Sequence, residues 1–90
     1  MITRQQLEQT LMDRDIEVVM YNGFEDACLG IGSRINTTVL VYSGPKMIEI
    51  LMSRDGMSYD DAEEYIAWNY LGAWVGDTTP IILTPVEELL

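Results

Sequence analysis

The sequence contains no histidine and only one cysteine, Cys28, among its 90 residues. Histidine is the side chain that most often transfers protons near neutral pH, so a histidine-activated nucleophile is excluded. A single cysteine excludes an intramolecular disulfide and a zinc site built from several thiolates. We expect Cys28 to pack as a small hydrophobic side chain within a strand rather than to react as a thiol. The sequence therefore predicts no catalytic residue, no cofactor and no enzymatic function.

Long apolar runs are also missing. No stretch of 18 apolar residues is present to span a membrane, and the first residues, MITRQQLEQTLMDRD, are polar and mixed in charge, unlike a secretory signal peptide. These two absences lead us to expect a cytoplasmic protein.

Basic residues are scarce and unevenly placed. The chain has 5 Lys and Arg against 15 Asp and Glu, a net charge of −10. All the Lys and Arg residues lie within residues 1–54, whereas every charged residue of 55–90 is Asp or Glu. Binding to phosphate backbones or anionic lipids normally requires clustered Lys and Arg. We therefore expect neither direct nucleic-acid binding nor membrane binding.

The composition is nevertheless that of a folded protein. Hydrophobic residues make up 48% of the chain and charged residues 22%, which lies outside the range typical of disorder. The length suits one domain, and neither a repeat nor a dividing linker is visible. We expect a single domain over residues 1–90, in which the last residues, 85–90 (PVEELL), form a flexible tail.

The N-terminal part predicts a helix followed by a strand. Thr3 and Gln6 have the spacing of a capping box, and Leu7 and Leu11 would share the inner face of the helix. Alternating apolar residues then predict a strand over residues 16–20, which an Asn-Gly turn would close.

Five further elements are expected along the rest of the chain. Two strands joined by a short turn would form a hairpin, a helix that begins near a proline would pack against both the sheet and the next helix, and a short strand would complete the sheet. The predicted fold is α+β, a small domain with a four-stranded antiparallel or mixed sheet and three helices in the order αβββααβ. The predicted ranges are Ala27–Arg34 and Thr37–Tyr42 for the hairpin, Pro45–Asp55 and Ser58 to about Leu71 for the helices, and Ile81–Thr84 for the last strand.

The helix that begins at Ser58 has an unusual run of acids, SYDDAEEY. Ser58 is the expected N-cap, Asp61 stands at the capping-box position, and first-turn carboxylates complement the helix dipole. Capping does not explain why no Lys or Arg follows to balance these acids. A magnesium site is disfavoured because adjacent helical carboxylates point in different directions, and no metal is predicted. The candidate partner-binding residues are Asp60, Glu63, Glu64 and Asp77.

Aromatic and apolar residues follow the acids at spacings of three and four. This spacing predicts one broad buried face, in which an asparagine would be either a satisfied buried amide or a rim residue of a cleft. The predicted face comprises Tyr59, Ala62, Tyr65, Ile66, Asn69, Tyr70 and Ala73. The candidate cleft residues are Tyr65, Trp68, Asn69 and Trp74.

The stretches RDGMSYDDAEEYIAWNYLGAWVGDTTPIIL, NGFEDACLGIGSRIN and VLVYS resemble a family of small uncharacterised proteins encoded by tailed bacteriophages. In that family an aliphatic-Gly-aliphatic-Gly strand segment precedes an RDGM(S/T)YEEA helix start and an aromatic-Asn-x-x-Gly-Ala continuation. The resemblance covers about residues 16–83. It implies a phage accessory protein in the cytoplasm of an infected bacterium, and it carries no established activity that could be transferred to any position.

Three functions remain open. The first is an interaction protein that binds a host or phage protein, and that inhibits a host or defence protein through an acidic surface mimicking nucleic acid. The second is a small-ligand-binding protein that uses the aromatic cleft. The third is a homo-oligomeric assembly protein in which the acidity serves solubility alone.

Overall fold

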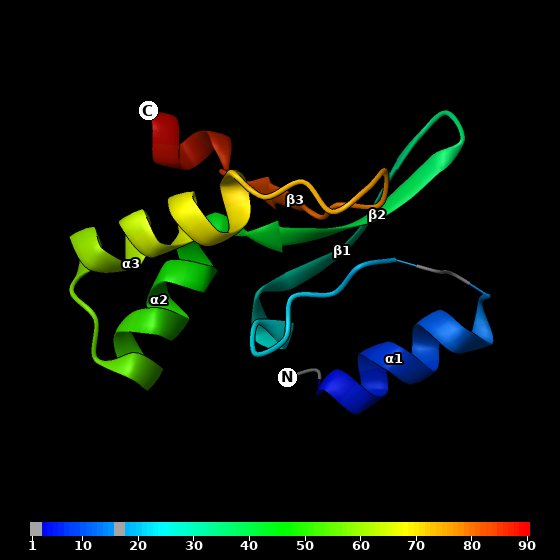
Figure 1. Cartoon of the computed structure of the whole chain (residues 1–90), viewed down its shortest axis with the longest axis horizontal. Coiled ribbons are helices and arrows are strands. Elements are labelled where there is room, and N and C mark those ends of the chain that lie inside the picture. Colours follow the sequence, from blue (N-terminus) through cyan, green and yellow to red (C-terminus); the bar gives the residue numbers. More distant parts are fainter. Residues whose placement is uncertain (1–2, 16–17) are drawn as a thin grey trace.

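The computed structural model describes residues 3–15 and 18–90, which form three α-helices, three strands and shorter helical turns (Figure 1). In chain order these elements are α1 (Arg4–Asp13), the 3₁₀ turn η1 (Glu25–Ala27), β1 (Cys28–Arg34), β2 (Thr37–Ser43), α2 (Gly44–Asp55), α3 (Tyr59–Ile66), the π-helical turn η2 (Ala67–Leu71), β3 (Ile81–Leu83) and the 3₁₀ turn η3 (Val86–Leu89).

The sheet is mixed, and β2 is its central strand. β1 and β2 form the predicted antiparallel hairpin, with Ile31 opposite Leu40. β3 pairs in parallel with the end of β2, where Val41 lies opposite Ile81. The β1–β2 register shifts between Cys28 and Gly30, and Gly30 has a φ of 145°, which a residue with a side chain rarely adopts. The predicted α+β class is thus confirmed.

The predicted fourth strand, over residues 16–20, does not appear in the described part of the chain. Residues 18–20 pair with no strand, and Ile16 and Glu17 lie outside the described residues. The Tyr21 N–H donates to Oη of Tyr42 at 3.0 Å, so a side chain rather than a strand ladder joins this segment to the sheet. The Asn-Gly turn is present, but it leads into η1 and not into a hairpin partner.

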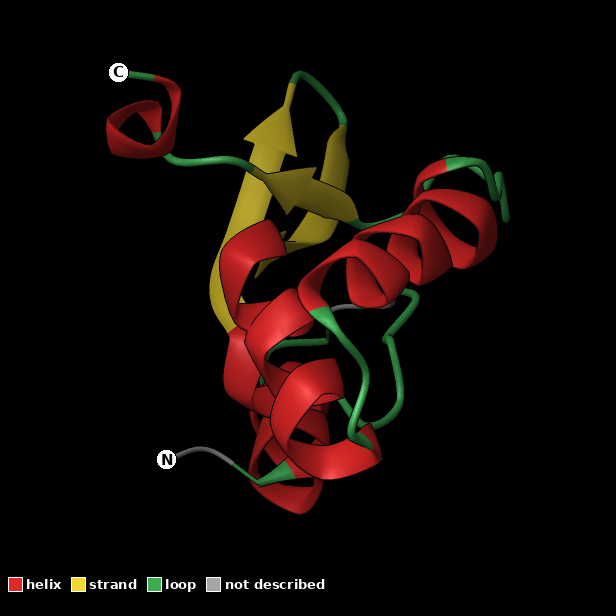
Figure 2. Ribbon diagram, turned by 90° about the vertical axis from the view of Figure 1, so that its left-hand side faces the viewer, coloured by secondary structure: helices red, strands yellow, loops and turns green. Residues whose placement is uncertain are grey.

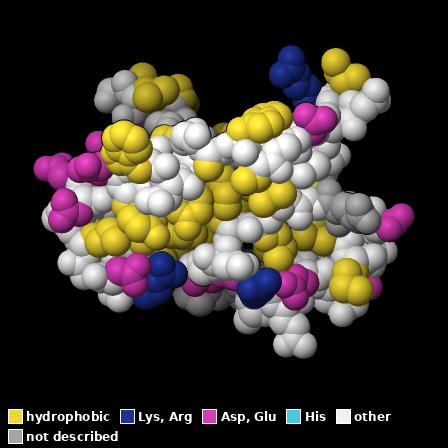
Figure 3. All heavy atoms as spheres, viewed as in Figure 1, with side chains coloured by type: hydrophobic (Ala, Val, Ile, Leu, Met, Phe, Trp, Pro, Cys, Tyr) yellow, Lys and Arg dark blue, Asp and Glu magenta, His cyan; other side chains and the backbone are white. Residues whose placement is uncertain are grey.

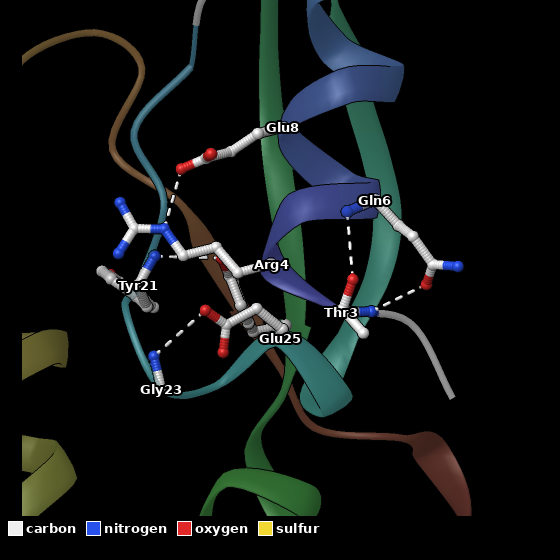
Figure 4. Close-up of polar contacts among 8 residues, drawn as sticks. Thr3, Arg4, Gln6, Glu8, Tyr21, Gly23 and Glu25 are labelled. Carbon is white, nitrogen blue, oxygen red and sulfur yellow. Dashed lines mark hydrogen bonds and ion pairs between the residues drawn. The ribbon is translucent and has the colours of Figure 1, made fainter.

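Helix α1 begins with the predicted capping box (Figure 4). Oγ1 of Thr3 accepts from the Gln6 N–H at 3.1 Å, and Oε1 of Gln6 accepts from the Thr3 N–H at 2.9 Å. These two bonds satisfy donors that a helix start otherwise leaves unpaired. Leu7 and Leu11 are buried, as their spacing predicts.

β2 passes into α2 without a loop. Ser43 is the last residue of the strand and the N-cap of the helix, and its Oγ accepts from the Lys46 N–H at 3.2 Å. A Cβ placed on Gly44 would lie 3.3 Å from the carbonyl oxygen of Leu83 and 3.3 Å from Cγ2 of Ile82. Glycine therefore allows α2 to start in close contact with β3.

The core lies where the helices meet the inner face of the sheet. In Figure 2 the strands occupy the upper part of the molecule and most of the helical turns lie below and to one side. Helix α2 contacts β2 and α3, which confirms its predicted position between the sheet and the next helix. Among the described residues, no polar or charged side chain is buried. The buried cluster consists of Leu7, Leu11, Phe24, Ala27, Leu40, Tyr42, Met47, Leu51, Ala62 and Ile66.

The second half of the predicted aromatic helix departs from α-helical geometry. Ser58 caps α3 as predicted, and Ala62 and Ile66 are buried, but Tyr65 is 39% exposed. The prediction that Tyr65 is largely buried is therefore wrong. Tyr65 lies in regular α-helix, beside the line through Ala62 and Ile66 that faces the core. From Ala67 the helix continues as η2, whose wider turn changes the angular spacing of the later side chains.

Two other members of the predicted buried face are also exposed. Tyr59 is 54% exposed and Asn69 lies at the surface, whereas Tyr70 is half-buried and packs against the core cluster. The buried stripe of α3 is consequently narrower than the sequence spacing predicts. The segment expected as a flexible tail contains η3, none of whose residues is buried.

Replacing Ile66 by alanine tests the buried stripe. Ile66 is 4% exposed, so truncation leaves a cavity and should reduce the free energy of unfolding by about 2–5 kcal/mol. The matched variant Tyr65→Ala, one residue earlier and partly exposed, should reduce it by less. Urea unfolding measures both, and equal losses for the two variants would contradict this assignment.

Stability should fall at alkaline pH because of Tyr42. Burial raises the pKa of the Tyr42 phenol from 10.0 to about 12, so ionisation is easier in the unfolded chain. The protonated phenol therefore stabilises the folded state fully below pH 10, and this contribution is lost as pH rises from 10 to 12. Each unit by which the folded and unfolded pKa values differ corresponds to about 1.4 kcal/mol of unfolding free energy. Urea unfolding from pH 8 to 11.5 measures this loss. The unfolding free energy of Tyr42→Phe should depend less steeply on pH, and a pH dependence equal to that of the parent protein would contradict the prediction.

Candidate functional site: an acidic and aromatic surface

Helix α3 carries the exposed carboxylates that the sequence singled out. Asp60, Glu63 and Glu64 are all exposed, and so is Asp61. The Asp61 N–H donates to Oγ of Ser58 at 3.1 Å, which fixes the helix start beneath the acids. Figure 3 shows Asp and Glu side chains gathered at the end of the molecule where α3 begins.

No base balances these acids among the described ion pairs. The three pairs join Arg4 with Glu8, Lys46 with Glu49, and Arg54 with Asp55. None of these three ion pairs involves a residue of α3. The N-terminal end of the helix dipole offsets about half an elementary charge, which leaves most of the negative charge uncompensated.

Arg54, the last base of the chain, is engaged elsewhere. Its Nη1 donates to the carbonyl oxygen of Gly23 at 2.9 Å, and its Nε and Nη2 donate to the Asp55 carboxylate at 3.0 Å. Its guanidinium also lies 5.4 Å from the centre of the Phe24 ring. The bond from Arg54 lowers the pKa of Asp55. Arg54 thus neutralises Asp55 and not the acids of α3.

Three of the four predicted cleft residues surround one open hollow at the junction of α3 and η2. Tyr65, Trp68 and Asn69 line it, and the Trp68 side chain is 78% exposed. The Tyr65 ring lies 6.2 Å from the ring of Tyr70, and Nδ2 of Asn69 donates to the Tyr65 carbonyl oxygen at 2.9 Å. The hollow has a volume of about 410 Å³, and its remaining lining residues are Met57, Asp61 and Glu64.

The structure places Trp74 and Asp77 apart from this hollow. Both line a separate groove of about 650 Å³ between the β1–β2 hairpin and the segment before β3. Arg34 also lines this groove, so both signs of charge are present there. The Thr79 hydroxyl accepts from the Val75 N–H at 3.0 Å and organises the segment. The predicted partner-binding set and the predicted cleft set are therefore each divided between two places.

A third concave surface was not predicted from the sequence. It is a groove of about 500 Å³ between α2, α3, β3 and η3, and Glu63 and Glu88 both line it. The nearby carboxylates, chiefly Glu63 and to a smaller extent Glu88, raise the pKa of the Tyr59 phenol. Glu88 was missed because its segment was predicted to be a flexible tail. The acidic pair in PVEELL was the one available signal.

Cys28 has the environment of a packing residue. Its side chain is half-buried against the core cluster, and burial raises the pKa of its thiol, which disfavours the nucleophilic thiolate. Within residues 3–15 and 18–90, no helix is long and apolar enough to cross a membrane.

Comparisons of the chain with protein-family models, with curated proteins and with solved structures found no match. The functional assignment therefore depends on the surface itself.

The acidic surface is expected to bind no metal ion tightly. Three or more metal-ligating side chains do not come together anywhere in the described residues, and the acids of α3 point outward as helix-start charges. Addition of about 5 mM Mg²⁺ or stoichiometric Zn²⁺ should leave the melting temperature unchanged, because a ligand stabilises only a fold that binds it. Stoichiometric binding by calorimetry would contradict this prediction.

Proposed function

We propose that this protein binds another protein, one with a basic surface, through the acidic and aromatic surface formed by α3 and η2. We define this acidic–aromatic surface as the exposed residues Asp60, Asp61, Glu63, Glu64, Tyr65 and Trp68. The observation that carries the proposal is the exposure of the Trp68 side chain directly beside a hollow lined by Asp61 and Glu64.

An exposed tryptophan is the typical anchor of a protein interface. Tryptophan is enriched among residues that dominate binding energy, and an aromatic side chain buries roughly 150–250 Å² on association. Trp68 makes the main apolar contribution next to the hollow, whereas Tyr65 is steadied by its contact with Tyr70. Trp68 would thus supply binding energy, while the carboxylates around it would favour a basic partner.

The carboxylates supply the attraction at longer range. Exposed charges of one sign accelerate association with an oppositely charged partner, and salt screens the effect. Because residues 55–90 contain no Lys or Arg, no base within this segment weakens the field. A protein with a basic nucleic-acid groove fits this surface well.

The resemblance to phage proteins suggests what the binding achieves. In an infected bacterium, an acidic surface of this kind would occupy the basic groove of a host or defence protein and exclude nucleic acid from it. Inhibition by mimicry is therefore the biological role that we propose for the binding.

A small-ligand site in the hollow is the less favoured function. The hollow is wide open to solvent, whereas small-molecule sites typically enclose most of the ligand. One N–H of the Asn69 amide, which such a ligand would use, already donates to the Tyr65 carbonyl oxygen.

Replacing Asp60, Glu63 and Glu64 together by their amides tests the proposal. A partner is first captured from host lysate at low salt, and its association rate is then measured by surface plasmon resonance at several salt concentrations. The triple variant should associate more slowly and with a weaker salt dependence, because steering depends on the net field. Trp68→Ala should instead raise the dissociation rate, by about tenfold or more.

A matched control removes three acids elsewhere. The variant Asp13→Asn, Asp15→Asn, Asp26→Asn loses the same charge from exposed positions on α1, its C-terminal turn and η1. Equal slowing by both triple variants, or no basic partner at low salt, would overturn the proposal.

A further inference from the structure

We propose that the groove between α3 and η3 receives an arginine side chain of the bound partner, with Glu63 and Glu88 holding its guanidinium. This inference rests on the proposed function and adds a specific recognition site to it. The site lies beside the acidic–aromatic surface and shares Glu63 with it.

The floor of the groove is apolar. Ile48 of α2, Ile66 of α3 and Ile82 of β3 meet there, with Pro45 and Leu71 beside them. Each of these residues comes from an element that is anchored in the core or the sheet. An arginine side chain has a three-carbon stem that packs on such a surface while its charged head stays near solvent.

The rim of the groove is acidic on two sides. Glu63 belongs to α3 and Glu88 to η3, two elements that are far apart in the sequence, and Tyr59 lines the same groove. Both carboxylates raise the pKa of the Tyr59 phenol, so their fields converge on this ring. A guanidinium in this groove would lie near both carboxylates and beside the aromatic side chain of Tyr59, and aromatic rings attract cations.

The N-terminus of α2 also lines the groove, and its partial positive charge opposes the binding of a cation there. A helix N-terminus carries about half a positive charge, against the two full negative charges of the rim. Its donors are largely engaged, since Pro45 has no N–H and the Lys46 N–H donates to Oγ of Ser43. The net preference of the groove is therefore for a cation.

Arginine suits this rim better than lysine does. Its planar guanidinium presents five N–H donors, which can reach two carboxylates at once, and it stacks on aromatic rings. A lysine ammonium is a compact and strongly hydrated charge, so its desolvation on entering the groove would cost more free energy.

The test uses blocked hexapeptides with one arginine between leucines, and companions in which lysine or glutamine replaces the arginine. Titration followed by ¹H–¹⁵N NMR should show shifts at Ile48, Ile66 and Ile82, with affinity in the order arginine, lysine, glutamine. The variant Glu63→Gln, Glu88→Gln should bind the arginine peptide more weakly, by about two- to five-fold for each lost carboxylate.

The control variant, Asp26→Asn, Glu87→Gln, removes two charges outside the groove, one of them next to Glu88. It should bind the arginine peptide within about twofold of the parent, and melting curves establish that both variants fold. Equal weakening by the two variants, or equal affinity for the arginine and glutamine peptides, would overturn the inference.

Failure of the inference can be told apart from failure of the proposed function. If Glu63→Gln, Glu88→Gln binds the captured partner as the parent does while Trp68→Ala does not, the partner uses the hollow, and the groove assignment is wrong. If neither variant changes binding of the partner, both proposals fail.

Discussion

The buried Tyr42 side chain is the contact on which the remaining structure depends. It lies on the central strand, is fully buried, and accepts the Tyr21 N–H through its phenol oxygen. The two rings lie 4.9 Å apart, and Tyr21 in turn contacts the edge of Tyr70 at 4.6 Å. Phe24 contacts the same Tyr70 ring at 5.4 Å. This chain of rings joins the sheet, the segment after α1 and the π-helical turn η2, so the element that presents Trp68 is held from beneath.

The charge of the surface also depends on the core. Arg54 lies in the last turn of α2, next in the chain to the acids of α3, but it bonds to Gly23 and Asp55 and lies over the Phe24 ring. It therefore closes the edge of the core and leaves α3 without a compensating base. The unbalanced acidity of α3 is in this sense a result of how the neighbouring turn packs, and not only of composition.

Local signals in the sequence predicted local structure well. The Thr3–Gln6 capping box, the β1–β2 hairpin and the Ser58 cap all depend on residues a few positions apart, and each is present. Two predictions failed, the strand around residues 18–20 and the width of the buried face of α3, because both depend on contacts that short sequence patterns do not reveal. The alternation around residues 18–20 resembles a strand, but these residues pair with no strand, and the next residue, Tyr21, donates its N–H to the Tyr42 side chain instead. Likewise, the spacing of three and four predicted a buried face wider than the one that packs: Tyr65 lies in the regular part of the helix but beside the buried line of Ala62 and Ile66. The groove lined by Glu63 and Glu88 needs a long-range approach of η3 that no short spacing encodes.

The direct passage from β2 into α2 has a mechanical consequence. Ser43 ends the strand and caps the helix, and Gly44 is in close contact with β3, so no hinge separates the sheet from α2. Two walls of the groove, those from α2 and β3, therefore move as one rigid body. Any widening of the groove to admit a larger side chain must come from the walls opposite, where the exposed turn η3 offers the least resistance because none of its residues is buried.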